Sequence, residues 1–95
     1  MLITLTSTAR INDWKALQKL NAEILIEKAR ELGAVRYRTY RNVHDASQVL
    51  FIIDLVDHDA VREMGEALGE QLSTLLQKGA PDDQVWEPVD WDSIG

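Results

Sequence analysis

Ala34-Val-Arg-Tyr-Arg-Thr-Tyr-Arg-Asn42 and Gln48-Val-Leu-Phe-Ile-Ile-Asp-Leu-Val56 are two β-rich stretches, and they decide the fold of this chain. The first alternates β-forming residues with arginines, which is typical of a strand at a sheet edge. The second is apolar on both sides until Asp54, and such a strand must be covered on both faces. The helical segments that flank this hairpin can cover one face. We expect a second copy of the chain to cover the other.

Length and composition predict one globular domain, residues 1–95, with residues 90–95 as a short C-terminal tail. The sequence is 45% hydrophobic and 27% charged, as in ordinary soluble proteins. No apolar run approaches the roughly 18 residues that span a bilayer. The net charge of −6 argues against binding to nucleic acid or to anionic membranes.

Several classes of chemistry are excluded by residues that the chain lacks. It contains no cysteine, so disulfides, thiol nucleophiles and thiolate metal sites are absent, and we expect a cytoplasmic location. Its two histidines cannot form a three-histidine metal site. No glycine-rich phosphate loop, nucleophile elbow or paired Ser/His arrangement is present, which excludes the common hydrolase and nucleotide-binding classes.

Residues 2–8 are short and β-branched and predict a first strand. Residues 13–32 have the apolar spacing of a helix that packs on one side. Asn12 is the expected N-cap of this helix, and Gly33 suits the left-handed position that ends one. The expected buried stripe consists of Trp14, Leu17, Leu20, Ile24, Leu25 and Leu32.

A second helix is predicted to begin after Asp57, another N-cap, and to be stopped by Gly79 and Pro81. Gly65 and Gly69 lie beside its apolar stripe. They predict either close packing against another backbone or a break into two shorter helices. The stripe consists of Val61, Met64, Leu68, Leu72, Leu75 and Leu76.

Residues 84–89 are the last predicted strand, which Pro88 places at a sheet edge or near the strand end. In the tail, Trp91 and Ile94 would need a docking surface, for which the partner subunit is a candidate. The element order is β-α-β-β-α-β, so the fold class is α+β and ferredoxin-like. Right-handed crossovers give a four-stranded antiparallel sheet with both helices on one face. Two bare faces stacked together make a homodimeric α/β barrel.

The chain resembles the dimeric α/β-barrel superfamily, particularly the small antibiotic-biosynthesis-monooxygenase-like (ABM) proteins. The resemblance covers residues 3 to about 91. It depends on the element order, on Asp13-Trp14-Lys15 opening the first helix, on Tyr40-Arg41-Asn42-Val43 and on Asp57-His-Asp-Ala-Val61. Members of this group include cofactor-independent oxygenases of aromatic polyketides, haem-degrading enzymes and quinol oxygenases. The resemblance implies a cleft between sheet and helices in which Asn, Trp, Tyr and Arg side chains act without a cofactor.

Asn21 lies in the apolar stripe of the first helix, where a polar group needs a partner. It can point into a ligand cleft, or a backbone carbonyl can satisfy it. Arg36, Arg38 and Tyr40 share one side of their strand, where they could grip a carboxylate or phenolate. Alternatively, the arginines protect a sheet edge from unwanted pairing or bind acidic residues.

The remaining candidate residues are aromatic or imidazole side chains. His58 follows Asp57 at the start of the second helix, where it is a candidate base or a solvated first-turn residue. His44 is expected to lie in an exposed turn. Trp14 and Trp86, together with Trp91, could wall an aromatic pocket, although core packing explains them equally well.

The predicted function is that of a cofactor-independent monooxygenase-like protein acting on a small phenol or quinol. Arg38, His58 and Asn21 are the candidate catalytic residues, with no cofactor and no metal. The candidate ligand-binding residues are Arg36, Tyr40, Trp14 and Trp86. The alternative is a non-catalytic homodimer that binds a small ligand or scaffolds a partner. Haem binding is a third hypothesis, which neither histidine position favours.

Overall fold

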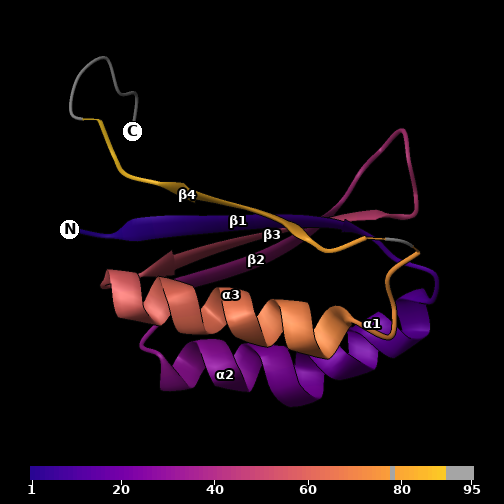
Figure 1. The fold of residues 1–95 in the computed structure, drawn as a ribbon, viewed down its shortest axis with the longest axis horizontal. Helices are drawn as coiled ribbons and strands as arrows, with labels where there is room; N and C mark the ends of the chain where they lie inside the picture. Colours follow the sequence, from indigo (N-terminus) through magenta and orange to yellow (C-terminus); the bar gives the residue numbers. More distant parts are fainter. Residues whose placement is uncertain (78, 90–95) are drawn as a thin grey trace.

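A four-stranded antiparallel sheet with helices on one face makes up the protein (Figure 1). The computed structural model describes residues 1–77 and 79–89. The strand order is β2-β3-β1-β4, and the predicted α+β, ferredoxin-like order is confirmed. The strands are β1 (Ile3–Arg10), β2 (Arg36–Arg41), β3 (Gln48–Leu55) and β4 (Asp82–Trp86). The helices are α1 (Trp14–Leu20), the π-helical turn η1 (Asn21–Leu25), α2 (Ile26–Glu31) and α3 (His58–Leu72).

The last strand differs from its prediction because β4 begins and ends earlier than residues 84–89. It pairs with β1 from Thr8↔Asp82 to Thr4↔Trp86. Pro88 therefore lies beyond the strand, where its missing N–H breaks no pairing. The prediction that β4 lies at a sheet edge is confirmed. The predicted docking of Trp91 and Ile94 falls outside the described residues.

The first helix is interrupted where a single helix was predicted. Its N-cap is Asp13, not Asn12, because the Asp13 carboxylate accepts the Ala16 N–H at 3.1 Å. In the π-helical turn η1 the backbone hydrogen bonds join residues five apart instead of four. This shift rotates the following residues around the helix axis. Ile24, predicted to be buried, is 40% exposed as a result, whereas Ala29 is buried.

The prediction that Asp57 caps α3 is confirmed, since its carboxylate accepts the Ala60 N–H at 2.8 Å. The predicted stop at Gly79 is wrong, because α3 ends at Leu72. Beyond it, Leu75 accepts a hydrogen bond from the Asn12 N–H at 2.9 Å, and Leu76 forms a β-bridge with Ile11. Because Leu75 and Leu76 pair with the segment that follows β1, their backbone does not continue the helix.

Gly65 does not break α3, and its close neighbour is a side chain and not a backbone. A Cβ atom at this position would lie 3.2 Å from Oδ2 of Asp83 in β4. A Cβ at Gly69 would meet nothing within 4 Å. Both predicted roles of these glycines are therefore wrong, because α3 is continuous and the close neighbour of Gly65 is the Asp83 carboxylate and not a backbone.

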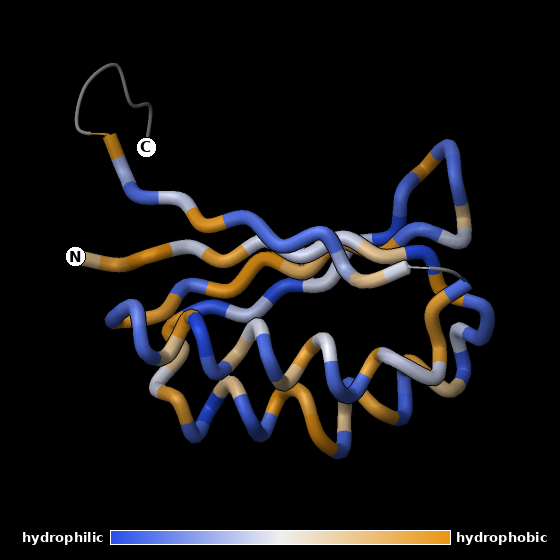
Figure 2. The backbone as a smooth tube through the Cα atoms, in the orientation of Figure 1, coloured by the Kyte–Doolittle hydropathy of each residue, from blue (hydrophilic) through white to orange (hydrophobic). Residues whose placement is uncertain are grey.

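The two faces of the sheet differ in what covers them. Helices pack on the covered face, where the core residues of the central strands are Ile3, Leu5, Ala9, Val49, Phe51, Ile53 and Leu55. Strand alternation (Figure 2) places the other residues on the open face. These are Thr4, Thr6, Thr8, Arg10, Arg36, Arg38, Tyr40, Gln48, Leu50, Ile52, Asp54, Asp82, Gln84 and Trp86. Across residues 1–77 and 79–89, no helix is long and apolar enough to cross a membrane.

Candidate functional site

A tyrosine and an asparagine form a polar pair between the sheet and the first helix. The Tyr37 hydroxyl, on the covered face of β2, donates a hydrogen bond to Oδ1 of Asn21. Burial raises the pKa of the Tyr37 hydroxyl far above its ordinary value, so it stays protonated and remains a donor at neutral pH. The sequence predicted either a ligand or a backbone carbonyl as the partner of Asn21. The structure shows a tyrosine hydroxyl.

The local backbone explains why Asn21 reaches this position. Asn21 begins the π-helical turn η1, and such turns occur frequently at functional sites. The Tyr37 ring packs against Phe51 with centroids 6.2 Å apart and planes inclined by 56°. Phe51 is fully buried, so it holds the tyrosine ring in one orientation.

A small groove opens beside this pair, between α2 and β2. Its volume is about 170 Å³. A cavity of roughly 150 Å³ is enough to hold benzene, so the groove has room for one aromatic ring. Its walls combine apolar side chains with the tyrosine and with arginines. The lining residues include Ile26, Ala29, Val35, Arg30, Arg36 and Tyr37.

Both arginines of the groove are already paired with carboxylates. Arg30 pairs with Glu27 one helical turn earlier. Nε of Arg36 lies 2.9 Å from Oδ2 of Asp54, whose other oxygen accepts the Thr4 hydroxyl at 2.5 Å. The Asp54 side chain is only 13% exposed, and it holds the Arg36 guanidinium on the open face of the sheet, away from the groove.

The sheet separates the predicted catalytic residues. Asn21 belongs to the covered side, whereas Arg38 lies with Tyr40 on the open face, as alternation along β2 requires. His58 is an exposed residue at the start of α3. That end of α3 lies at the same end of the molecule as the end of α2 (Figure 1), but His58 does not line the groove.

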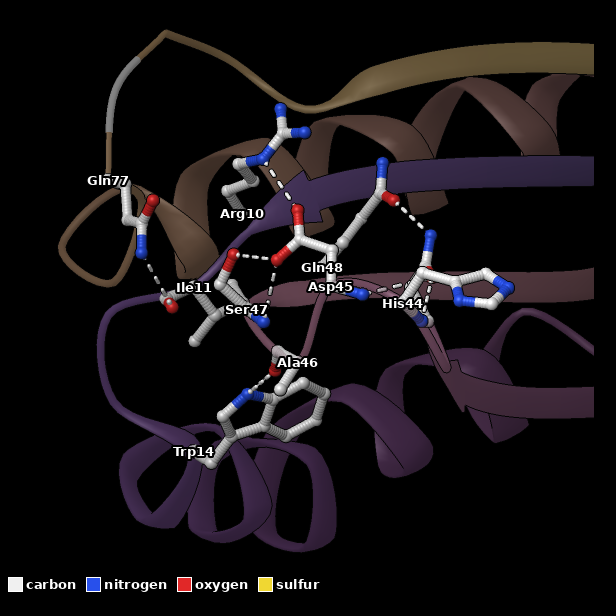
Figure 3. Close-up of polar contacts among 10 residues, drawn as sticks. Arg10, Ile11, Trp14, His44, Asp45, Ala46, Ser47, Gln48 and Gln77 are labelled. Atoms are coloured by element: carbon white, nitrogen blue, oxygen red, sulfur yellow. Dashed lines mark hydrogen bonds and ion pairs between the residues drawn. The ribbon is translucent and has the colours of Figure 1, made fainter.

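The predicted aromatic residues also lie on different sides. Trp14 stacks against the guanidinium of Arg41, with 4.0 Å from Cζ to the ring centroid. Its indole N–H donates to the Ala46 carbonyl at 2.6 Å (Figure 3). Trp86 lies on the open face, and its indole N–H donates to the Thr6 hydroxyl at 2.7 Å. The two tryptophans do not share a pocket.

The turn between β2 and β3 is held by a polar network (Figure 3). Asp45 accepts hydrogen bonds from the Ser47 hydroxyl at 2.6 Å and from Nε of Arg10 at 3.0 Å. These bonds lower the pKa of the Asp45 carboxyl, with those from Ser47 the main cause. His44 is exposed in this turn, as predicted. Within residues 1–77 and 79–89, no three metal-ligating side chains gather at one point.

Comparisons with known proteins identify the fold. No protein-family model and no curated protein matches this sequence. Solved structures do match. SnoaB, a cofactor-independent oxygenase from Streptomyces nogalater, is 18% identical with a TM-score of 0.74, covering 96% of both chains. A candidate antibiotic biosynthesis monooxygenase from Caulobacter crescentus is 20% identical with a TM-score of 0.72, covering 94% of this chain and 91% of the other.

The chain has the ABM fold. A third match agrees, a candidate antibiotic biosynthesis monooxygenase from Nitrosomonas europaea with 11% identity and a TM-score of 0.71. It covers 94% of this chain and 91% of the other. At such identities the likeness concerns the fold, and activity must be argued from the residues of this chain.

Sequence reasoning missed Tyr37 as a residue of this ABM-fold site. The available indication was its alternation with Arg36 and Arg38, which places Tyr37 on the side of the sheet that faces the helices. The link to Asn21 could not be found in this way. The Tyr37–Asn21 contact depends on the π-helical turn, which no residue pattern in the helix predicts.

Proposed function

We propose that this protein is a cofactor-independent oxygenase that acts on a small phenol or quinol. One observation carries the proposal. The groove between α2 and β2 has room for a single aromatic ring and is lined in part by Tyr37, whose hydroxyl donates to Asn21. SnoaB, which shares the fold, is itself a cofactor-independent oxygenase.

The groove residues have different roles in binding the substrate. Ile26 and Val35 contact the ring and exclude water from one side of it. Arg36 lies on the open face with Asp54, so the groove cation that can stabilise a phenolate through a charge-assisted hydrogen bond is Arg30 of α2. The neutral Tyr37 hydroxyl has a single hydrogen, which Oδ1 of Asn21 accepts, so it can donate to the phenolate only by exchanging Asn21 for the phenolate oxygen. His58 would take the phenolic proton through water, since it does not line the groove.

The substrate itself supplies the electrons in this reaction. A phenol and O2 give a quinone and water, which balances both atoms and electrons. The protein then has to bind the ring, favour its anion and exclude bulk water. Arg38 and Tyr40, on the open face, take no part when the ring lies in the groove.

Oxygen uptake with a panel of phenols and dihydroxyaromatics tests the proposal. We expect substrate-dependent uptake that Arg30→Ala reduces at least tenfold. Arg62→Ala is the matched control, because Arg62 is an exposed cation on α3 whose ion pairs within residues 1–77 and 79–89 are with Asp59 and Glu66 of its own helix. Uptake that is lost in Arg38→Ala but retained in Arg30→Ala would move the substrate to the open face.

A non-catalytic ligand-binding homodimer is the second candidate, and one observation favours it. Asn21 and Tyr37 satisfy each other, and the neighbouring core is filled, since Leu25, Phe51 and Leu68 are fully buried. A ligand that raises Tm without any oxygen uptake would support this function over the oxygenase.

We also propose that the protein is a homodimer with the open faces in contact. The described helices pack on the other face of the sheet (Figure 1), and strand alternation places Leu50 and Ile52 on this one. Apolar side chains gathered on one surface favour association. Sedimentation at micromolar concentration should show a dimer, and a single subunit would contradict this. The cytoplasmic location remains a prediction.

A further inference from the structure

We propose that a hollow at the end of the sheet, beside the turn between β2 and β3, binds a small zwitterion of the amino-acid type. Its carboxylate would lie on Arg10 and its ammonium group on Asp82. The volume is about 470 Å³, within the range of about 300–1,000 Å³ that small-molecule sites occupy. This hollow is separate from the groove between α2 and β2. A single chain supplies all its residues, so the proposal stands apart from the oxygenase and from the homodimer.

Three strands and the segment between α3 and β4 meet around the hollow. The residues that line it include Thr8, Arg10, Gln48, Gln77, Ala80 and Asp82. Strand pairing fixes their spacing, since Asp82 is the direct neighbour of Thr8 on β4 and Gln48 is the neighbour of Arg10 on β3. Arg10 and Asp82 are therefore diagonal neighbours, with Cα atoms about 7–8 Å apart.

The turn between β2 and β3 fixes one end of the Arg10 guanidinium and leaves the other end available. Nε of Arg10 donates to Asp45 at 3.0 Å, which is its ion pair within residues 1–77 and 79–89. A guanidinium has five N–H donors, so both Nη groups can serve a further acceptor. Figure 3 shows them pointing away from Asp45 and from helix α1. A carboxylate can accept two parallel bonds from such a group.

A hydrogen-bond network orients the Gln48 amide as a second donor. Oδ1 of Asn42 accepts the backbone N–H groups of His44 and Asp45 at 2.7 and 3.2 Å, so Nδ2 of Asn42 is the donor to Gln48. That bond, 2.8 Å long, occupies Oε1 of Gln48 and leaves its Nε2 for a ligand. Figure 3 shows Nε2 on the same side as the Arg10 guanidinium. The two donors suit one carboxylate.

The part of the hollow next to β4 carries acceptors. Nε2 of Gln77 donates to the Ile11 carbonyl at 3.5 Å, which turns Oε1 of Gln77 away from that carbonyl (Figure 3). Asp82 adds a carboxylate. An ammonium group has three donors and no acceptor, so it suits both. Among the described residues, Arg10 and Asp82 form no ion pair with each other. A molecule that carries both charges can bridge them.

The charges around the hollow favour a zwitterion over a simple anion or cation. The Asp45 carboxylate that holds Arg10 repels an isolated anion, and the Arg10 guanidinium repels an isolated cation beside Asp82. A zwitterion places each of its charges next to the opposite one. It therefore gains a charge-assisted hydrogen bond at each end, and such bonds are roughly twice as strong as neutral ones.

Amide NMR titrations with three amino acids test the proposal. L-alanine, β-alanine and γ-aminobutyrate carry their ammonium and carboxylate groups at increasing separation. We expect at least one of them to bind, with chemical-shift changes centred on Thr8, Gln48 and Asp82. Propionate and propylamine each carry one charge and should bind at least tenfold more weakly. The proposal is overturned if none of the amino acids binds, or if a singly charged probe binds equally well.

A charge-removing variant tests the position of the site. Asp82→Asn keeps the size of the side chain and removes its charge, so we expect the Kd of the bound amino acid to rise at least tenfold. Glu87→Gln is the matched control, because it makes the same change of charge beyond the end of β4 and should leave the Kd unchanged. Equal effects of the two substitutions would overturn the role of Asp82.

Two further variants separate this site from the other proposals. Ala80→Trp fills the hollow without removing a charge, and since Ala80 is exposed, the fold should be retained while binding is lost. Retained binding in Ala80→Trp would place the ligand elsewhere. Ile52→Lys, which should weaken the proposed dimer, should bind the amino acid as the wild type does. Binding lost in Ile52→Lys would contradict a site made by one protomer, whereas oxygen uptake, measured separately, tests only the oxygenase.

Discussion

The two sides of β3 carry similar residues but meet different surroundings. Val49, Phe51, Ile53 and Leu55 point to the covered face and are all 0% exposed. Leu50 and Ile52, equally apolar, point to the open face and are only partly buried. One protomer thus completes the core on one side of the strand, and the other side is the one that the proposed dimer would cover. Apolar character alone does not distinguish a core from an interface.

Phe51→Ala should have the largest effect, because it removes a fully buried ring from the covered face. We expect the free energy of unfolding to fall by about 3–5 kcal/mol. Urea denaturation measures this change. Ile52→Ala is the matched control on the open face and should reduce the stability of the protomer much less. Equal losses would mean that the two sides of β3 do not differ in the way described.

Ile52→Lys tests the open face through association. A charge placed beside Leu50 on the open face should weaken the proposed dimer about 100-fold, which is about 2.7 kcal/mol. Sedimentation over a range of concentrations measures the Kd, and circular dichroism checks that the fold is retained. A folded variant that associates as tightly as the wild type would exclude this face as the interface.

Tyr37→Phe tests the polar pair on the covered side. It leaves Oδ1 of Asn21 without its donor, and we expect a loss of about 1–2 kcal/mol in stability. A double-mutant cycle with Asn21→Ala separates this bond from the general effect of each substitution. A coupling energy near zero would show that the pair contributes nothing, and the site would lose its fixed orientation.

Asp83→Asn should have the smallest effect, and its sign depends on pH. Asp83 accepts the hydroxyl of the buried Ser7 at 2.5 Å, and partial burial raises the pKa of its carboxyl above the ordinary 3.8. The folded state therefore binds the proton more tightly than the unfolded state. The Asp83 contribution to stability is most favourable below 3.8 and is lost as pH rises through the raised pKa.

Asp83→Asn removes the cost of partly burying a charged carboxylate, and its amide oxygen still accepts the Ser7 hydroxyl. After allowance for solvent screening, we expect a gain of about 0.5 kcal/mol at pH 7, or about 2–4 °C in Tm. Thermal melts at pH 7 and pH 4 provide the comparison, with the gain shrinking toward acid pH. A gain that grew as the pH fell would contradict the raised pKa.

Hydrophobic periodicity predicted the elements and their order, but it did not predict where each helix stops. The α3 stripe continues through Leu75 and Leu76, so a longer helix was expected. The structure ends α3 at Leu72 because these two leucines pair with the chain that follows β1. Such pairing joins residues more than 60 positions apart, which a local pattern does not reveal.

The candidate site was only partly predictable for the same reason. Alternation correctly placed Arg36, Arg38 and Tyr40 on one side of β2. It could not show that Asn21 would meet Tyr37, because that contact requires the π-helical turn to rotate the helix. The groove exists only where α2 and β2 meet, so it has no counterpart in the sequence of either element.

The sequence by itself determined the β-α-β-β-α-β order and the apolar character of both sides of β3, because these depend on residue spacing of two and of three to four. Only the tertiary structure decided which of those sides the helices cover, and which side chains meet across the layers. Such contacts form where segments that are distant in the sequence come together, and the packing at those places determines their contribution to the free energy of folding.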